Sequence, residues 1–212
     1  IFWMYNDSWP VTHGWTIVDY YLRRKLAYHP VRRAFQPVTA IVAEDEGLIT
    51  VYGVNDSPVP WHGEVRYGLF KLAGGLPLDC TEPVILEPNT ASPLAHFERD
   101  LWEQTGLSCS GAFALLQKQE RPISQHRMFL ERFKALEFTE PEIRLTREGS
   151  DIVLSSEAFV WGLCLDLDGE WPLQDNCFDL IPEIPYRMPW HDELGDPAVE
   201  RIGNDLVLMR QQ

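Results

Sequence analysis

The sequence has none of the short ligand spacings from which metal sites are usually built. Its four cysteines form no Cys-x-x-Cys pair, and its six histidines form neither His-x-x-x-His nor His-Glu-x-x-His. A zinc site is therefore not expected, and no other metal or cofactor is expected either. Domains of about 100 residues can bury a core without disulfides, so we expect the cysteines to be free, either as small buried apolar residues or as incidental residues.

Long apolar runs and basic charge are also scarce. No stretch approaches the ~20 apolar residues of a membrane-spanning helix, and no signal peptide is visible. The net charge is -14, although residues 1–37 carry five Lys/Arg against two Asp/Glu, which leaves -17 on the remainder. An acidic surface repels phosphate backbones and anionic lipid heads. Neither nucleic acid nor a membrane is therefore an expected partner.

What the chain does have is an aromatic beginning. Three tryptophans lie in the first nineteen residues, and Ile1–Tyr5 is an uninterrupted apolar run. Such a run predicts a strand that is buried on both faces, as in a parallel sheet covered by helices. Asn6, Asp7 and Trp9 follow at the carboxyl end of this run. Barrels and doubly wound folds place their ligand chemistry at that end of a strand.

Residues 1–37 as a whole are expected to form a strand, a loop and a helix. Four apolar residues at helical spacing predict one stripe on this helix, which would lie on a barrel wall: Ala27, Val31, Ala34 and Phe35. Pro30 interrupts the pattern and predicts a kink or a helix that starts late. The opposite face is expected to be solvated and to carry the basic residues Arg23, Arg24, Lys25, Arg32 and Arg33.

From Val38 the hydrophobic period changes from helical to two. Short β-type runs separated by turn residues occur at 40–42, 48–54, 65–72, 84–86 and 112–116, and again at 152–154, 159–165, 178–180 and 206–209. Such spacing is typical of antiparallel sandwiches of the immunoglobulin type. We expect a mainly β chain with two such sandwiches, at residues 38–138 and 139–212. Residues 129–138 are either the last strand of the first sandwich or a linker, and Pro141 marks the boundary.

The segment 159–169 is predicted to be a strand followed by a tight turn. Alternation predicts that four apolar residues share one face of the strand: Phe159, Trp161, Leu163 and Leu165. Asp168-Gly169 is a hairpin-turn signal. Asp166 and Asp168 form the most tempting acidic pair in the chain, but they lack the other ligands of a calcium loop, so we interpret them as turn residues.

Several segments resemble a known family. The motif Trp-x-x-Asn-Asp-x-Trp-Pro at residues 3–10 is similar to the final barrel strand of β-mannosidase-type glycoside hydrolases of family 2. Residues 25–38 resemble that family's closing barrel helix, and 54–56 fit a turn in the sandwich that follows. Residues 173–182 are similar to its Ser-Asp-Asn-x-Phe-Asp-Leu-x-Pro segment. The resemblance implies the carboxyl-terminal part of such an enzyme, with a remnant of a (β/α)8 barrel at 1–37 before the two sandwiches.

The resemblance also implies a sugar-binding site at the first motif. In relatives the residue equivalent to Trp3 lines the pocket for the terminal sugar, and flat aromatic rings stack on the C–H faces of sugars. Asn6, Asp7 and Trp9 are expected to contribute to substrate binding beside it. The alternatives are that Asn6 and Asp7 hold the loop by hydrogen bonds and that the tryptophans serve only as core or anchor. The departures Met4 and His13-Gly14 lie near this pocket and leave the sugar preference open.

The chain contains no Asn-Glu dipeptide. Retaining hydrolysis of a glycoside needs two carboxyl groups about 5–5.5 Å apart. In the family both are glutamates on earlier barrel strands, one of them after an Asn, so no catalytic residue is assigned here and the chain alone is expected to be inactive. The resemblance implies a parent enzyme that removes terminal β-linked sugars, most readily mannose. The expected partners are a glycoside substrate and an upstream catalytic barrel of the same protein.

A second class of function is a non-catalytic carbohydrate-binding or scaffolding sandwich. Such modules bind glycans through exposed aromatic side chains, and an upstream Asn-Glu on a barrel pattern would argue against this class. The candidates in the β-rich part of the chain, each also expected as a packing residue, are Trp61, Trp102, Trp171 and Trp190.

Overall fold

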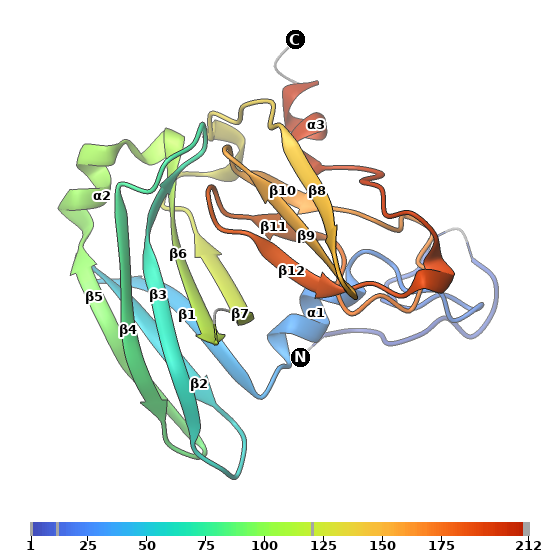
Figure 1. Ribbon diagram of the computed structural model, residues 1–212, viewed down its shortest axis with the longest axis horizontal. Helices are drawn as coiled ribbons and strands as arrows, with labels where there is room; N and C mark the ends of the chain where they lie inside the picture. Colours follow the sequence, from blue (N-terminus) through green and yellow to red (C-terminus); the bar gives the residue numbers. More distant parts are fainter. Residues whose placement is uncertain (1, 12, 120, 210–212) are drawn as a thin grey trace.

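The computed structural model describes residues 2–11, 13–119 and 121–209 and shows a mainly β protein (Figure 1). Strands dominate from Val38 onward, and within the described residues every pairing between them is antiparallel. The expected fold class of sandwich-like β sheets is confirmed. None of the described helices is long and apolar enough to cross a membrane.

Two sheets face each other in the part of the chain that we call the first sandwich (residues 38–128). One sheet has the order β1-β2-β5, with β1 at Val38–Asp45, β2 at Leu48–Asn55 and β5 at Thr90–Glu98. The other has the order β4-β3-β6-β7, with β3 at Trp61–Lys71, β4 at Leu78–Leu86, β6 at Ser110–Lys118 and β7 at Arg121–Met128. The short helices α2 (Arg99–Thr105) and η1 (Leu107–Cys109) connect β5 to β6.

Alternation along the strands builds the core of the first sandwich. In β2, Ile49 and Val51 are fully buried while their neighbours are partly exposed, and they meet Leu69 and Leu116 from the facing sheet. Trp102 of α2 closes one end of this core with no exposed surface. Side chains of this size contribute about 1.5–3 kcal/mol each on full burial, so the core is the main support of the sandwich.

The C-terminal sheets (residues 143–189) form the second β unit of Figure 1. Strands β8 (Ile143–Glu148), β9 (Asp151–Ser156) and β12 (Tyr186–Pro189) pair in the order β12-β9-β8, and β10 (Val160–Leu163) pairs with β11 (Phe178–Leu180). The helices η3 (Asp192–Leu194) and α3 (Gly203–Leu208) follow. The core of the C-terminal sheets contains Leu154, Leu180 and Trp190.

A third apolar cluster joins the two β units. Phe70 and Phe113 point outward from the first sandwich and meet Phe159, whose ring stacks on that of Phe70 with centroids 4.9 Å apart. Residues 129–138, left open as strand or linker, contain only the short helix η2 (Phe133–Ala135) and contribute Leu136 and Phe138 to this cluster. Both faces of β3 and β6 are consequently covered.

The expected buried strand at the beginning of the chain is wrong for the described residues, and Ile1 lies outside them. Residues 2–11 and 13–27 contain no named helix or strand, only isolated bridges from Val18 to Asn6 and to Arg24. The residues from Phe2 to Tyr5 are exposed, Trp3 at 72%. A strand buried on both faces needs paired neighbours on either side and helices over it, and the described residues supply neither here.

Helix α1 spans Tyr28–Ala34 and starts late, as Pro30 predicted. Pro30 sits in its first turn, where a missing N–H breaks no helical hydrogen bond. The described residues include no barrel wall, so the expected orientation of the apolar stripe stays a prediction. Phe35 is 66% exposed, while the buried residue of α1 is His29. Residues 206–209 were expected to form a strand but fall mostly in α3, and the strands β5, β7, β8 and β12 were not predicted. Of the four free cysteines, Cys164 is buried and the other three are partly buried.

Candidate functional site

The residues predicted to bind a sugar lie on a loop that backbone hydrogen bonds hold in place. The Met4 N–H donates to the Trp15 carbonyl at 3.1 Å, and the Val18 N–H donates to the Tyr5 carbonyl at 2.8 Å. Asp7 in turn donates its N–H to the Val18 carbonyl at 3.1 Å. Two stretches of the segment, 4–7 and 15–18, therefore run side by side. We call residues 2–18 the aromatic loop.

Asp7 is the buried carboxylate of the aromatic loop, with 8% of its surface exposed. Its Oδ2 accepts a hydrogen bond from Lys25 Nζ at 2.9 Å, and the same ammonium donates to Thr16 Oγ1 at 2.6 Å. The hydrogen bond from Lys25 is the main cause that holds the pKa of Asp7 below its ordinary value. A Cβ at Gly14 would lie 2.4 Å from Asp7 Oδ1, so this carboxylate fits only because residue 14 is glycine. Asp7 thus has the contacts that a loop-holding residue requires.

Trp3, Asn6 and Trp9 are exposed, in contrast to Asp7. Trp3 is 72% exposed, Trp9 65%, and Trp15, which was not among the predicted binding residues, 81%. The Asn6 amide donates to the Asp7 carbonyl at 3.4 Å. The Trp3–Met4 peptide bond is cis. Aromatic faces open to solvent beside an amide offer both the stacking surface and the polar edge that sugar binding needs.

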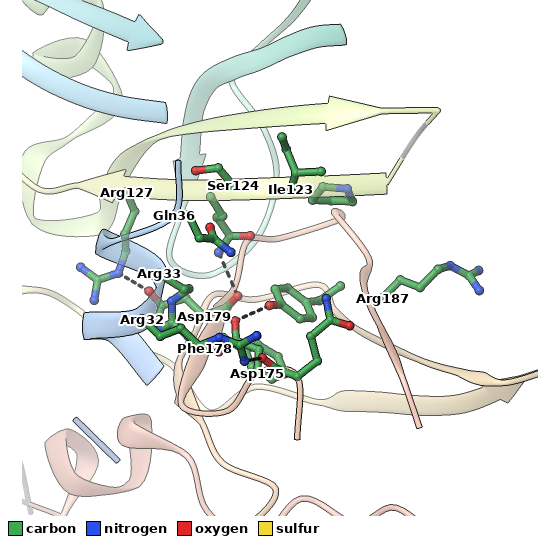
Figure 2. Close-up of a pocket in the computed structure, with 14 residues that line it drawn as sticks. Arg32, Arg33, Gln36, Ile123, Ser124, Arg127, Asp175, Phe178, Asp179 and Arg187 are labelled. Atoms are coloured by element: carbon green, nitrogen blue, oxygen red, sulfur yellow. Dashed lines mark hydrogen bonds and ion pairs between the residues drawn. The ribbon is translucent and has the colours of Figure 1, made fainter. Parts of the chain in front are cut away.

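The arginines of α1 bond the C-terminal sheets although Arg32 is exposed and Arg33 partly exposed, so the expectation of a merely solvated basic cluster is wrong. Arg33 pairs with Asp175 at 2.5 Å and donates to the Cys177 carbonyl at 2.8 Å, and Arg32 donates to the Gln174 carbonyl. Figure 2 shows Arg32 and Arg33 beside Asp175. Charge-assisted hydrogen bonds of this kind are about twice as strong as neutral ones, so they dock α1 on the C-terminal sheets.

His29 completes the docking face of α1. Its side chain is 2% exposed, its Nδ1 lies 3.7 Å from Asp175 Oδ1, and this nitrogen has no hydrogen-bond partner among the described residues. Burial lowers the pKa of His29 to about 4, because desolvation and the nearby arginines outweigh the attraction of Asp175. The imidazole is therefore neutral at pH 7.

The segment 173–182, which carried part of the family resemblance, has a structural role at nearly every position. Asp175 receives Arg33 and also the Tyr186 hydroxyl at 2.6 Å. Phe178 stacks on the Tyr186 ring with centroids 4.0 Å apart. Asp179 accepts from Arg127 of β7 at 2.6 Å (Figure 2). The partners of Asp175 and Asp179 lie on α1 and on the first sandwich, so this segment ties both to the C-terminal sheets.

A polar cleft of about 300 Å³ lies at this junction, between α1, β7 and the segment 174–187. Three of its four arginines pair with carboxylates: Arg33 with Asp175, Arg127 with Asp179, and Arg187 with Glu148 and Asp151. The fourth, Arg32, donates to the Gln174 carbonyl. The cleft is lined by residues that hold the fold, and the aromatic loop does not contribute to it. Sequence reasoning missed these pairs; the Asp-Asn-x-Phe-Asp run, unusually polar for a buried strand, was the signal for them.

The other candidates are structural. Within the described residues there is no group of three His, Cys, Asp or Glu side chains that could hold a metal ion. Asp166 accepts from the Gly169 and Trp171 backbone N–H groups, as a turn residue does. The tryptophans proposed for a binding module are buried or pack against a core, with Trp102 at 0% and Trp190 at 2% exposed.

Known proteins resemble this chain both in sequence and in the arrangement of its helices and strands. The family model of the Mannosidase Ig/CBM-like domain matches residues 47–135. β-Mannosidase B of Thermothelomyces thermophilus is 26% identical over 85% of this chain and 24% of its own length. The crystal structure of β-D-mannosidase from Dictyoglomus thermophilum superposes with a TM-score of 0.78 and 22% identity, covering 94% of this chain and 26% of that one. The chain resembles the carboxyl-terminal part of the β-mannosidases.

Two further proteins resemble this chain, one in sequence and one in fold. β-Mannosidase of Mus musculus is 31% identical over 37% of this chain and 9% of its own length. The exo-chitosanase of Amycolatopsis orientalis shares the fold, with a TM-score of 0.57, 15% identity, 92% of this chain and 28% of that chain covered. The β-mannosidase-like chain thus spans about a quarter of the length of the first relative, and the comparisons place it in a glycoside hydrolase context.

Proposed function

We propose that this chain is the carboxyl-terminal part of a retaining, exo-acting β-mannosidase that removes terminal β-linked mannose from a glycoside or oligosaccharide. The observation that carries the proposal is the match to β-mannosidases along most of the chain, in sequence and in fold. In this proposal residues 1–37 belong to a catalytic barrel, and residues 38–138 and 139–212 are two sandwich domains that support it.

The contribution of this chain to the reaction would be substrate binding. The exposed face of Trp3 is available to stack on the C–H face of a terminal sugar, with Asn6 and Trp9 near its edge. Asp7 would act indirectly, because its carboxylate is bound to Lys25 and keeps the aromatic loop in place without touching the sugar. Stacking that holds the ring in the geometry for attack lowers the barrier only when the reacting carboxyl groups are present as well.

The two reacting carboxyl groups are proposed to lie on the upstream barrel. A retaining glycosidase needs an acid/base and a nucleophile about 5–5.5 Å apart. Asp7 is the one buried carboxylate of the aromatic loop, and its pKa is lowered by Lys25, whereas a general acid needs a raised pKa. It is therefore unsuited to protonate a leaving group, and the proposal assigns no catalytic residue to this chain.

An activity assay on two proteins tests the proposal. The longer reading frame that contains this chain and the 212-residue chain alone are purified and assayed with an aryl β-mannoside and an aryl β-glucoside. We expect turnover of the mannoside by the longer protein with net retention, and none by the chain alone. Turnover by the chain alone, or none by a folded longer protein, would contradict the assignment.

A non-catalytic carbohydrate-binding role is the second candidate, and the exposed faces of Trp3, Trp9 and Trp15 favour it. Binding of the 212-residue chain to mannan can be measured by affinity electrophoresis, with Trp3→Ala and Trp15→Ala variants. Mannan binding that depends on these tryptophans, combined with a longer protein that lacks activity, would select this role over the enzyme.

A further inference from the structure

A turn of the C-terminal sheets touches the N-terminal segment at its backbone. The Arg24 N–H donates to the Gly169 carbonyl at 2.9 Å. Gly169 has φ +70°, and a Cβ there would lie 2.1 Å from the Arg24 carbonyl oxygen and 2.8 Å from the Arg24 nitrogen. Contacts below 3.0 Å with backbone atoms cannot be relieved by a side-chain rotation. Any other residue at 169 must therefore push the two segments apart.

The turn that carries Gly169 is itself fixed to the core of the C-terminal sheets. Asp166, 6% exposed, accepts the Gly169 N–H at 2.9 Å on one carboxylate oxygen and the Trp171 N–H at 2.7 Å on the other. Its own carbonyl accepts from the buried amide of Asn176 at 2.7 Å. A turn held at three points presents the Gly169 carbonyl in one place.

From Arg24 the connection continues into the aromatic loop through Lys25. The Lys25 N–H donates to the Ile17 carbonyl at 3.0 Å, and its ammonium binds Asp7 and Thr16. Val18 pairs with Arg24 in an isolated antiparallel bridge. The Arg24 guanidinium adds a second tie to the C-terminal sheets, since it donates to the Leu173 carbonyl at 3.1 Å. A displacement at residue 24 is therefore passed directly to residues 7 and 16–18.

We propose that the turn 166–171 is a positioning element for the aromatic loop, with Gly169, Asp166 and Arg24 as positioning residues that touch no substrate. The inference rests on the proposed function, because it assigns a sugar-contacting role to the loop that the turn supports. It assigns the C-terminal sheets a specific role, which is to fix the position of the aromatic loop that carries Trp3 and Trp9. Asp166 of the acidic pair thereby acquires a role in geometry rather than in chemistry.

The test compares Gly169→Ala with a matched control, Gly149→Ala. Gly149 lies in the β8–β9 turn of the same C-terminal sheets and has φ +64°, and a Cβ added there would meet no atom of the described residues within 4 Å. Both variants place alanine at a positive φ and so share the backbone strain. Only Gly169→Ala adds the contact with Arg24.

Amide hydrogen exchange on the 212-residue chain is the first readout. We expect Gly169→Ala to speed exchange at Asp7, Arg24 and Lys25 by about tenfold or more, with no change at the buried amides of β6, and Gly149→Ala to change none of them. Equal exchange at these three amides in both variants would overturn the positioning role. If Gly169→Ala does not fold, Asp166→Asn, which keeps the shape but replaces one of the two accepting oxygens by an NH2 donor, is expected to give the same pattern at smaller amplitude. Absence of that pattern would count equally against the proposal.

Kinetics of the longer protein are the second readout. We expect Gly169→Ala to raise KM for an aryl β-mannoside about tenfold with a smaller fall in kcat, because displaced aromatic rings bind the sugar less well, and Gly149→Ala to leave both unchanged. Unaltered KM in a folded Gly169→Ala enzyme would overturn the link from turn to sugar site. A wild-type protein without glycosidase activity would refute the proposed function instead, and hydrogen exchange would still decide whether the turn positions the loop.

Discussion

The first sandwich and the N-terminal segment use the same kind of residue in opposite ways. Trp102 has no exposed surface and donates its indole N–H to Ser110 Oγ at 2.9 Å inside the core. Trp3 and Trp15 present most of their surface to solvent. The sandwich has continuous antiparallel ladders, whereas the segment 2–27 has isolated bridges.

The difference lies in what stabilises each region. Apolar burial supports the first sandwich, whereas polar contacts with the C-terminal sheets support the N-terminal segment and α1. Arg24 donates its backbone N–H to Gly169 and its guanidinium to the Leu173 carbonyl, and Arg33 of α1 pairs with Asp175. Most of the exposed large apolar side chains among the described residues lie between Phe2 and Phe35. A concentration of exposed aromatic surface of this kind marks a place that another molecule or protein surface covers. Under the proposed function these are the sugar and the rest of the barrel.

The largest effect is expected from truncating the buried tryptophan. Trp102→Ala should cost about 3–5 kcal/mol of unfolding free energy, because it leaves a cavity in the core and removes the indole N–H that Ser110 Oγ accepts. Trp15→Ala, at 81% exposure, should change it by less than about 0.5 kcal/mol. Urea unfolding of both variants decides the matter. Similar losses for the two would remove the contrast between the regions.

The second expected effect is a loss of stability in acid, located at the junction. The folded-state pKa of His29 is about 4, below the ordinary 6.5, so the unfolded chain takes up this proton first. The stabilising contribution is complete above pH 6.5 and is lost as the pH falls toward 4, by up to about 3 kcal/mol. Facing groups are Asp175, which opposes the shift, and Arg24, Arg32 and Arg33, which support it.

His29→Gln isolates this effect, because the buried His126, whose pKa burial also lowers, is present in both proteins. Unfolding free energies of wild type and variant are measured at pH 7, 5.5 and 4.5. The wild type should lose more stability than His29→Gln over this range. Parallel curves, or an NMR titration that gives His29 a pKa at or above 6.5, would show that the burial of α1 does not depend on a neutral imidazole.

Alternation in the sequence predicted the sandwich where both the pattern and the partners were local. The alternation that includes Ile49 and Val51 predicts β2. Glu46 and Gly47, both at positive φ, form the hairpin turn between β1 and β2. The run at the beginning failed, because an apolar pattern does not show whether neighbours exist to bury it. The strand at 159–165 failed in part. Gly162 at φ +58° shifts the register, so that Trp161 joins one cluster and Leu163 another.

The sequence predicted which residues belong to the candidate site but not how they are arranged in space. The motif around Trp3 pointed to a binding loop, but nothing local shows that Arg33 has its partners 142 to 144 positions further along the chain. Basic residues at helical spacing are normally solvated, and here the helix presents that face to a segment with ionised and carbonyl acceptors. The role of Gly169 was equally hidden, since a hairpin signal does not tell which backbone will lie against the turn.

The third prediction concerns the sugar contact in the longer protein. Trp3→Ala should lower kcat/KM for an aryl β-mannoside by about 1–3 kcal/mol in transition-state stabilisation, or roughly 5- to 150-fold, because stacking on the terminal sugar is lost. The melting temperature should hardly change, since the ring is 72% exposed in this chain. Unchanged kcat/KM together with a large drop in melting temperature would assign Trp3 to a core instead.

The smallest global effect is expected at the Lys25–Asp7 pair. Lys25→Met keeps the length of the side chain but removes the ammonium that binds Asp7 and Thr16. The pair lies outside the apolar cores, so the melting temperature should shift by less than about 2 °C. Locally the change should be larger. Amide exchange at Asp7 and Ile17 should rise while that of β3 and β6 stays constant. The Asp7 pKa should return toward its ordinary value because the hydrogen bond that lowers it is gone.

Arg66→Met, which breaks the exposed pair with Asp79 on the first sandwich, is the matched control and should leave the aromatic loop unaffected. Loss of the global fold in Lys25→Met would mean that the N-terminal segment and the sandwich are one cooperative unit, contrary to the contrast drawn from their burial.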